Sequence, residues 1–357
     1  MKVVLFDVDG KIPNLALMKL SSFYKSKGYH PILSKKPELI PADLYFASAV
    51  FSYGKSLEKI DRLRQLYRGK VAIGGTGVDI SLGLTDEVEC SFPDYNLYAH
   101  TQYALGFLTR GCDKRCAFCV VPKKEGRLQP SYSTFDDFVP KGQQNVMLLD
   151  NNLLASPNAN DLLDEMAKRQ FKVNFSQTLD IQYLTDEIYP RLKMVDSVNS
   201  RFTRKMIYFS CNTVKQAKWF DRQSDKLRGF GKGRVTAVIM YGFNTRLTQD
   251  FTILKMMRKL GVLPFVQEYQ PITDVPAQIP DDYFDMDLND VAEFRIRSNG
   301  QNGEKFLRYV SALYLNRYGR YYLPLLKAIY RYNNKPRLQY YLDRPHLFST
   351  EMYKRYV

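Results

Sequence analysis

Three cysteines stand close together along the chain, as Cys112, Cys116 and Cys119, with the spacing C-x3-C-x2-C. A loop with this spacing can bring three thiolates to one centre, and thiolates are the usual protein ligands of iron–sulfur clusters. Three ligands leave one iron of a cuboidal four-iron cluster without a protein bond. Because an open iron can bind a small molecule through an amine and a carboxylate, the loop predicts a reactive centre.

Two other roles for these cysteines are less well supported. A structural zinc site needs a fourth Cys or His at ordinary spacing, and the nearest candidates, Cys90 and His100, lie upstream at an unusual distance. A disulfide framework is disfavoured because the chain has five cysteines, an odd number, and because acidic residues interrupt its first ten positions, unlike a signal peptide. We therefore expect reduced cysteines and a cytoplasmic protein.

The composition limits the classes of protein further. With 357 residues, of which 45% are hydrophobic, the chain is long enough for two or three domains. No uninterrupted apolar stretch approaches the length that crosses a bilayer, so we expect a soluble protein without a membrane partner. The net charge of +15 predicts an anionic substrate or partner, with nucleic acid among the possibilities.

Residues 1–98 alternate between strand and helix patterns. Strands are expected at 3–6, 31–33, 43–51 and 70–77, and helices at 15–27 and 57–67. Such alternation predicts an α/β domain of the Rossmann-like, doubly wound kind, with a parallel sheet and ligands at the carboxyl ends of its strands.

Residues 99–285 repeat strand, loop and helix around the cysteines. Six strands are expected, at 104–108, 145–149, 173–175, 205–210, 234–241 and 264–269, with helices such as 161–169 and 248–260 between them. Six such units predict a partial (β/α)6 barrel. The cysteines directly follow the first strand, at the carboxyl end where the chemistry of parallel barrels gathers.

Residues 286–357 form an extension of different composition. Between Glu304 and Val357, 11 Lys or Arg stand against 3 Asp or Glu, interleaved with 11 Tyr. The tyrosines fall mostly at helical spacings, which favours a helical extension that packs on the barrel. Basic residues mixed with aromatic ones also suit a nucleic-acid surface, and this alternative stays open.

Two further motifs occur in residues 1–98. Asp7 and Asp9 follow an apolar strand, as in the first motif of haloacid-dehalogenase-type phosphatases, but no convincing pair of acidic residues for Mg²⁺ appears before the cysteines. Residues 49–56 end in Gly-Lys-Ser like a phosphate-binding loop, yet the first glycine of that pattern is missing. Neither phosphatase nor nucleotide chemistry is therefore expected.

The segment 111–119, GCDKRCAFC, resembles the signature of the radical S-adenosylmethionine (SAM) superfamily, including the aromatic Phe118 before the third cysteine. The resemblance implies a [4Fe-4S] cluster on Cys112, Cys116 and Cys119 that binds SAM and cleaves it reductively. The resulting 5′-deoxyadenosyl radical would abstract hydrogen from a substrate, and a low-potential donor such as flavodoxin or ferredoxin would supply the electron. No catalytic side chain is assigned. A nucleic-acid-binding protein with a structural or redox-sensing cluster is the alternative.

The resemblance also implies a SAM surface at the strand ends. Asp150 and Asn151 follow the second strand, where the family commonly carries a Gly-Gly-Glu-like motif for the SAM amino group, although a helix cap is an alternative role. The further SAM-contacting candidates are Phe118, Gln177, Asp180, Ser210, Gly242 and Phe243. Arg110 and Lys114 beside the cysteines, and Lys123 to Glu125 beyond them, either hold anionic groups or solvate the loop.

Residues 1–98 resemble the cobalamin-binding domain that often precedes a radical SAM core, in the first loop and in the Gly74-Gly75 turn. The family's loop usually supplies a histidine to the cobalt. Here that loop carries Asp7 and Asp9, and no histidine occurs before His30. We therefore expect a structural or substrate-positioning domain, with cobalamin bound without a histidine ligand as the less favoured alternative.

Overall fold

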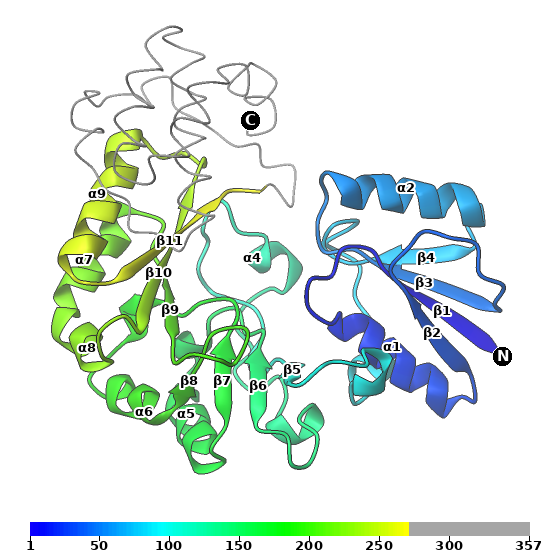
Figure 1. Ribbon diagram of the computed structural model, residues 1–357, viewed down its shortest axis with the longest axis horizontal. Helices are drawn as coiled ribbons and strands as arrows, with labels where there is room; N and C mark the ends of the chain where they lie inside the picture. Colours follow the sequence, from blue (N-terminus) through cyan, green and yellow to red (C-terminus); the bar gives the residue numbers. More distant parts are fainter. Residues whose placement is uncertain (271–357) are drawn as a thin grey trace, which may run out of the picture. The chain divides into compact units, whose positions relative to one another are not determined.

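The computed structural model describes residues 1–270 (Figure 1), and the expectations for the basic extension at 286–357 lie outside the described residues. The described chain divides into two compact units. The first contains Met1–Gln177 and Pro190–Lys205, and the second contains Thr178–Tyr189 and Met206–Gln270. Within residues 1–270, no helix has the length and apolar character of a membrane span.

The first sheet belongs to the first unit and has four parallel strands in the order β2-β1-β3-β4. Its strands are β1 (Lys2–Asp7), β2 (His30–Ser34), β3 (Leu44–Ser48) and β4 (Val71–Gly74), and its helices are α1 (Leu15–Ser26) and α2 (Lys55–Tyr67). The parallel α/β sheet expected for residues 1–98 is confirmed.

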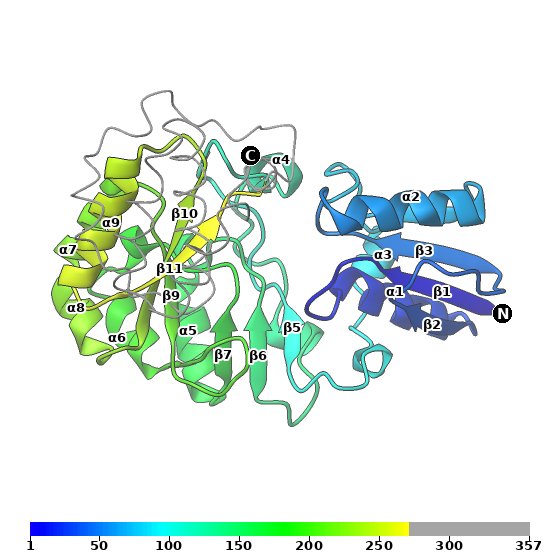
Figure 2. The same ribbon diagram turned by 45° about the horizontal axis from the view of Figure 1, so that its top comes forward.

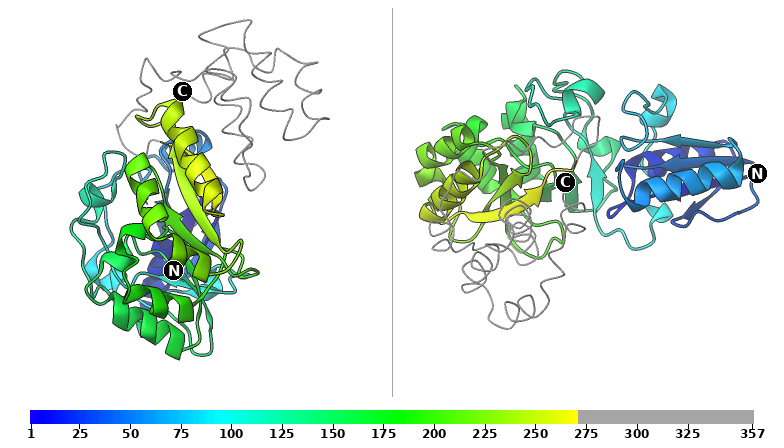
Figure 3. Two further views of the ribbon diagram at one scale, coloured as in Figure 1. Left: turned by 90° about the vertical axis from the view of Figure 1, so that its left-hand side faces the viewer. Right: turned by 90° about the horizontal axis from the view of Figure 1, so that it is seen from above.

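Helices cover both faces of this sheet because the four central residues of β1, Val3 to Phe6, are all apolar and buried (Figure 2). Val3 and Leu5 pack on the side of α1, whereas Val4 and Phe6 pack on the side of α2. Successive side chains of a strand point to opposite faces, so a continuous apolar run needs a cover on each. Figure 3 shows this blue sheet and its helices from two further sides. Asn14 caps the start of α1, because its side chain accepts a hydrogen bond from the Leu17 N–H.

The second sheet also belongs to the first unit and is parallel, in the order β5-β6-β7-β8. Its strands are β5 (Ala104–Gly106), β6 (Asn145–Leu148), β7 (Lys172–Phe175) and β8 (Asp196–Ser197). Around them lie α4 (Val121–Lys124), α5 (Ala159–Lys168), α6 (Ile188–Met194) and the 3-10 helices η2 (Phe135–Asp137) and η3 (Leu153–Ala155). The chain between the first two sheets forms α3 (Asp86–Glu89), which contacts α1, and the 3-10 helix η1 (Tyr95–Leu97), which contacts α1 and β2.

The third sheet belongs to the second unit, with parallel strands in the order β11-β10-β9. The elements are β9 (Ile207–Ser210), β10 (Val235–Tyr241), β11 (Leu263–Glu268), α7 (Val214–Arg222), α8 (Ser224–Gly229), α9 (Leu247–Lys259) and the 3-10 helix η4 (Ile181–Tyr183).

All six strands expected between residues 99 and 270 are present, with small shifts at their ends, and β8 is an additional one. The single partial barrel is not confirmed, because these strands form two separate sheets. The short β8 explains part of this difference, since its two residues pair with β7 alone. The domain boundaries at residues 98 and 285 stay predictions.

Candidate metal centre

The cysteine loop leaves β5 and closes on itself as an antiparallel pair. Arg110 and Gln129 exchange backbone hydrogen bonds of 3.2 and 2.7 Å, and the Cys112 N–H donates to the Gly126 carbonyl at 3.2 Å. Paired backbone at both ends anchors the segment between Cys112 and Gly126 as one closed loop. The cysteines therefore sit on a defined turn of chain even though the loop has little regular structure.

Gly111, directly before the first cysteine, is required by this closure. It has φ of +80°, and a Cβ at its position would lie 2.2 Å from the Arg127 carbonyl oxygen. Any side chain would therefore push the two ends of the loop apart and would also strain the backbone. Within the motif 111–119, the closure of the loop therefore explains the glycine at position 111 independently of any ligand.

Cys112, Cys116 and Cys119 form no disulfide and are half-buried. The Cys119 N–H donates to the Cys116 carbonyl at 2.9 Å, and the Lys114 N–H donates to Cys112 Sγ at 3.4 Å. Burial raises the pKa of the Cys119 thiol, and the neighbouring Cys116 and Cys112 raise it further, against a hydrogen bond from the Val121 N–H. Each thiolate therefore makes the next one harder to form unless a cation neutralises them.

The donor set fits an iron–sulfur cluster, which is held by thiolates. Within residues 1–270, no three Cys, His, Asp or Glu side chains are arranged to hold a single metal ion. A cuboidal cluster does not need the three sulfur atoms to meet at one ion, because each cysteine bonds to a different iron. The other two cysteines differ in their surroundings: Cys90 is exposed, and Cys211 is fully buried.

Three consecutive residues after β6 hold the start of the cysteine loop. Asp150 accepts hydrogen bonds from the Leu108 N–H at 3.1 Å and from the Thr109 N–H at 2.5 Å, and also from the Thr109 hydroxyl at 2.8 Å. Asn151 Oδ1 accepts from the Gly111 N–H at 3.0 Å. Because β5 and β6 are parallel neighbours, their carboxyl ends meet at one edge, and the side chains after β6 reach the backbone after β5.

Asp150 is buried, and this burial raises the pKa of its carboxyl from 3.8 to about 6, although hydrogen bonds from Thr109 and Leu108 lower it. Its oxygens serve the backbone that leads into the cysteines. The predicted contact of Asp150 with the SAM amino group stays a prediction, and the structure adds a second role, that of anchoring the loop.

Asn152 reaches furthest toward the cysteines. Its Nδ2 lies 3.6 Å from Cys112 Sγ, so the amide donates to the sulfur. The residue is 5% exposed, and its Oδ1 is buried without a hydrogen-bond partner among the described residues. A buried oxygen of this kind is costly unless another group donates to it.

The other predicted SAM contacts lie in other settings. Phe118 is half-buried within the cysteine loop, and Gln177 is exposed after β7. In the second unit, Asp180 caps η4 by accepting from the Gln182 N–H at 3.0 Å. The structure brings Asp150 and Asn151 to the cysteine segment. The second-unit candidates stay predictions.

The other second-unit candidates, Ser210, Gly242 and Phe243, lie at the carboxyl ends of strands in the third sheet. Ser210 ends β9, and its N–H donates to the Leu179 carbonyl at 2.9 Å. Gly242 follows β10 with φ of +81°, and the ring of Phe243 lies 4.8 Å from that of Tyr269.

The acidic residues after β1 are occupied within the N-terminal domain. Asp7 accepts from the Gly10 N–H at 2.8 Å and from the Tyr98 hydroxyl at 3.0 Å, and Asp9 accepts from the N–H groups of Val50 and Phe51, both at 2.9 Å. These bonds give both aspartates a structural role. They also use two backbone donors that a phosphate loop at residues 49–56 would direct to its ligand.

His30, the first histidine of the chain, is exposed at the start of β2 and pairs in register with Lys2 at the start of β1. It therefore lies at the amino end of the parallel sheet, opposite the edge where such sheets bind ligands. His100 is exposed as well.

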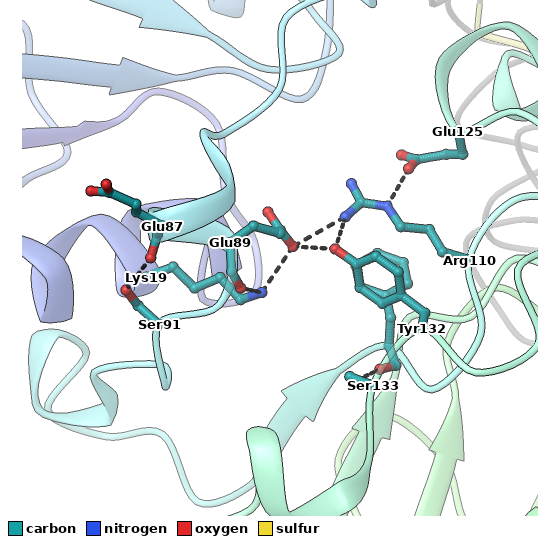
Figure 4. Close-up of polar contacts among 9 residues, drawn as sticks. Lys19, Glu87, Glu89, Ser91, Arg110, Glu125, Tyr132 and Ser133 are labelled. Carbon is teal, nitrogen blue, oxygen red and sulfur yellow. Dashed lines mark hydrogen bonds and ion pairs between the residues drawn. The ribbon is translucent and has the colours of Figure 1, made fainter.

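The partners of Arg110 could not be predicted from the sequence. Its guanidinium contacts Glu89, Glu125 and Tyr132, three residues that lie up to 22 positions away along the chain (Figure 4). Arg110 is therefore bound within the protein and does more than solvate the loop. Its sequence context contains no signal for these contacts, because an ion pair between distant segments leaves no local pattern.

Comparison with models of protein families and with curated proteins gave no match. Among solved structures, Streptococcus suis SuiB bound to S-adenosylmethionine has a TM-score of 0.37 and 13% identity, covering 73% of this chain and 59% of that chain. SuiB bound to the precursor peptide SuiA has a TM-score of 0.36 and 14% identity, covering 60% and 46%. The matched part thus spans about half the length of these structures. TM-scores this low decide nothing about the chemistry of this chain.

Proposed function

We propose that this chain is a radical SAM enzyme whose cluster is held by Cys112, Cys116 and Cys119. The observation that carries the proposal is the cysteine loop itself, with three half-buried cysteines outside any disulfide on a closed loop that the residues after β6 anchor. When bound, a [4Fe-4S] cluster supplies an open iron and an electron for cleavage of SAM to a 5′-deoxyadenosyl radical. The chain's own residues bind and orient SAM and shield the site from water.

Asn152 is the residue we assign to the SAM amino group. Asp150 and Asn151 already accept hydrogen bonds from the loop backbone, whereas Asn152 Oδ1 is buried beside Cys112 without a described partner. The amino group of SAM would bind the open iron as a neutral amine, and one of its remaining N–H bonds would donate to this oxygen and remove the cost of its burial. The sequence pointed to this segment, and the structure distinguishes its three members by what each one holds.

Further assignments complete the proposal. Phe118 and Gln177, with Asp180, Ser210, Gly242 and Phe243 in the second unit, remain candidate contacts for SAM. The proposed electron donor is a low-potential protein such as flavodoxin or ferredoxin, and the proposed compartment is the cytoplasm, which keeps thiols reduced. Cobalamin is not favoured, since the carboxylates after β1 are occupied.

Anaerobic reconstitution with iron and sulfide tests the proposal. The native chain should hold about four irons and form 5′-deoxyadenosine from SAM under reduction. Cys112→Ala should abolish the formation of 5′-deoxyadenosine, whereas Cys90→Ser, at an exposed cysteine outside the loop, should leave it unchanged. Formation of 5′-deoxyadenosine by the Cys112→Ala chain would refute the assignment.

The net charge of +15 keeps a second candidate function, a nucleic-acid-binding protein with a structural or redox-sensing cluster. The same reconstitution separates the two functions. A chain that holds iron, binds nucleic acid with a steep dependence on salt and forms no 5′-deoxyadenosine would favour the second one.

A further inference from the structure

One carboxylate of the N-terminal domain joins the start of the cysteine loop (Figure 4). Glu89, the last residue of α3, directs Oε1 to three donors: Lys19 Nζ at 2.8 Å, the Tyr132 hydroxyl at 2.5 Å and Arg110 Nη1 at 3.1 Å. Lys19 belongs to α1, while Arg110 precedes the first cysteine by two residues. All of these residues belong to the first unit.

Arg110 is held on every side. Its Nε contacts Glu125, just beyond α4, at the far end of the cysteine loop, and its guanidinium lies 5.0 Å from the centres of the Phe107 and Tyr132 rings. The side chains of Glu89 and Arg110 are only 24% and 22% exposed. A planar guanidinium fixed by two carboxylates and two rings has few orientations left. The Arg110 backbone, which pairs with Gln129, is fixed with it.

Two carboxylates and two cations form ion pairs in this group: Lys19 and Arg110 face Glu89, and Arg110 also faces Glu125. Lys124 lies near Glu125 as well. Burial raises the pKa of Glu89, but hydrogen bonds from Lys19 and Tyr132 outweigh that effect and keep the pKa below its ordinary value. Glu89 is therefore held as a carboxylate, and removing it would leave two cations partly buried with a single counter-charge.

A second contact reaches the other flank of the loop. Thr76, in the turn after β4, accepts a hydrogen bond from Lys124 Nζ, and Lys124 is the last residue of α4. Burial lowers the pKa of this lysine. The N-terminal domain thus contacts the cysteine loop on both sides, through Arg110 before the cysteines and through Lys124 after them.

We propose that Glu89 is a positioning residue through which the N-terminal α/β domain, by way of Arg110, holds the cysteine loop in the shape that receives its metal centre. The N-terminal domain then stabilises the conformation of the loop, and this role needs no cofactor bound to the domain. The inference rests on the proposed function in one respect, that the loop receives an iron–sulfur cluster.

The test uses the full chain with Glu89→Ala, Glu89→Gln and the control Glu87→Ala. Glu87 lies on the same helix and has the same charge but is exposed. A glutamine keeps an oxygen acceptor for Lys19, Tyr132 and Arg110, so Glu89→Gln should act as a partial rescue. Thr76→Val is a second, milder variant, because it removes only the contact on the other flank.

The first measurement is made on the metal-free chain. Alkylation rates of Cys112, Cys116 and Cys119, determined by mass spectrometry relative to the unfolded chain, report how tightly the loop is held. We expect an increase of about tenfold in Glu89→Ala and smaller increases in Glu89→Gln and Thr76→Val, with native rates in Glu87→Ala. Equal rates in Glu89→Ala and Glu87→Ala would overturn the proposal.

The second measurement is made after anaerobic reconstitution. Glu89→Ala should lose iron to a chelator about tenfold faster than the native chain, and the EPR spectrum of its reduced cluster should differ, with Glu89→Gln between the two. Native iron loss and a native spectrum in Glu89→Ala would overturn the proposal. If the native chain takes up no iron, the proposed function fails, and the alkylation rates still decide whether Glu89 positions the loop.

Discussion

The two sheets of the first unit carry polar residues at the same position, just after the carboxyl ends of their strands, but use them differently. At the end of β1, all four carboxylate oxygens of Asp7 and Asp9 accept hydrogen bonds, from the N–H groups of Gly10, Val50 and Phe51 and from the Tyr98 hydroxyl. After β6, Asp150 and Asn151 hold the cysteine segment, and Asn152 retains a buried oxygen without a described partner. At the first edge every carboxylate oxygen has a donor within the protein, whereas at the second edge one buried oxygen remains as an acceptor for a ligand.

This difference shows why polar residues at strand ends do not by themselves identify a site. Parallel sheets gather such residues at one edge whether or not a ligand binds there. What separates the two edges is the balance of donors and acceptors. A buried acceptor without a partner is uncommon in folded proteins. The described residues contain others, such as Asn160 Oδ1, so Asn152 Oδ1 stands out because its amide also contacts Cys112 Sγ.

The largest expected effect distinguishes Asp150 from Asp7. Asp150→Ala removes the acceptor for Leu108 and Thr109, so we expect a loss of about 3 kcal/mol in stability and less than half of the native iron content after reconstitution. Asp7→Ala should cost a similar amount, because it too leaves buried donors unpaired, but its iron content should be native.

Urea unfolding and iron analysis of both variants check this prediction. Stability should fall in both, and iron only in Asp150→Ala. Equal iron contents in the two variants would show that the residue after β6 has no special relation to the cysteine loop.

The pH dependence of the free energy of unfolding should show an effect as large as the loss of stability expected for Asp150→Ala. The pKa of Asp150 is raised from 3.8 to about 6 in the folded chain. Between these values the folded state retains a proton that the unfolded state has released. Below pH 4 the group therefore makes its full contribution to the free energy of unfolding. As the pH rises through about 6, this contribution is lost, and the free energy of unfolding falls by about 3 kcal/mol in total.

Urea midpoints measured between pH 4 and pH 7 check the slope, with Asp150→Asn as the control, since an amide does not titrate in this range. The native chain should lose stability relative to Asp150→Asn as the pH rises. Parallel curves for the two chains would show that the Asp150 carboxyl does not titrate with a raised pKa.

The sequence was informative where the pattern is local. The apolar run of β1 and the alternation that follows it predicted a parallel sheet, and the spacing of Cys112, Cys116 and Cys119 predicted one loop. The division of the core strands into two sheets was not predicted, because strand pairing depends on contacts between distant segments. The same reason hid the Glu89–Arg110 pair, which joins two segments with no shared motif.

Within the strand-end segment, the sequence could predict the type of residue but not its task. Asp150, Asn151 and Asn152 look alike as polar residues before a turn. Only the structure shows that the first two hold backbone N–H groups and that the third reaches Cys112 Sγ. Which of three adjacent polar side chains faces a site depends on the backbone angles of the turn, and these are not encoded in residue type alone.

A smaller effect concerns the affinity for SAM. Asn152→Ala removes the buried acceptor and the N–H donor to Cys112, so we expect SAM binding to weaken about tenfold, the equivalent of one hydrogen bond of about 1.4 kcal/mol. The matched control is Asn145→Ala at the opposite end of β6, where the amide donates to the Gln102 carbonyl.

Calorimetric titration of the reconstituted chains with SAM checks this prediction. The control should bind SAM as the native chain does, and Asn152→Ala should bind more weakly while holding the same amount of iron. Native affinity in Asn152→Ala would remove Asn152 from the proposed site and would make the edge after β6 as closed as the edge after β1.

The last prediction is that replacing His30 has no effect on the binding of cobalamin. If the N-terminal domain bound cobalamin through a histidine, that residue would have to reach the carboxyl edge of the first sheet, whereas His30 lies at the start of β2. We expect hydroxocobalamin, added to the full chain and then reduced, to give no EPR nitrogen coupling from a protein imidazole, in the native chain and in His30→Ala alike. A coupling that is present in the native chain and lost in His30→Ala would show that the N-terminal edge is open to a cofactor, and the contrast between the two sheets would then disappear.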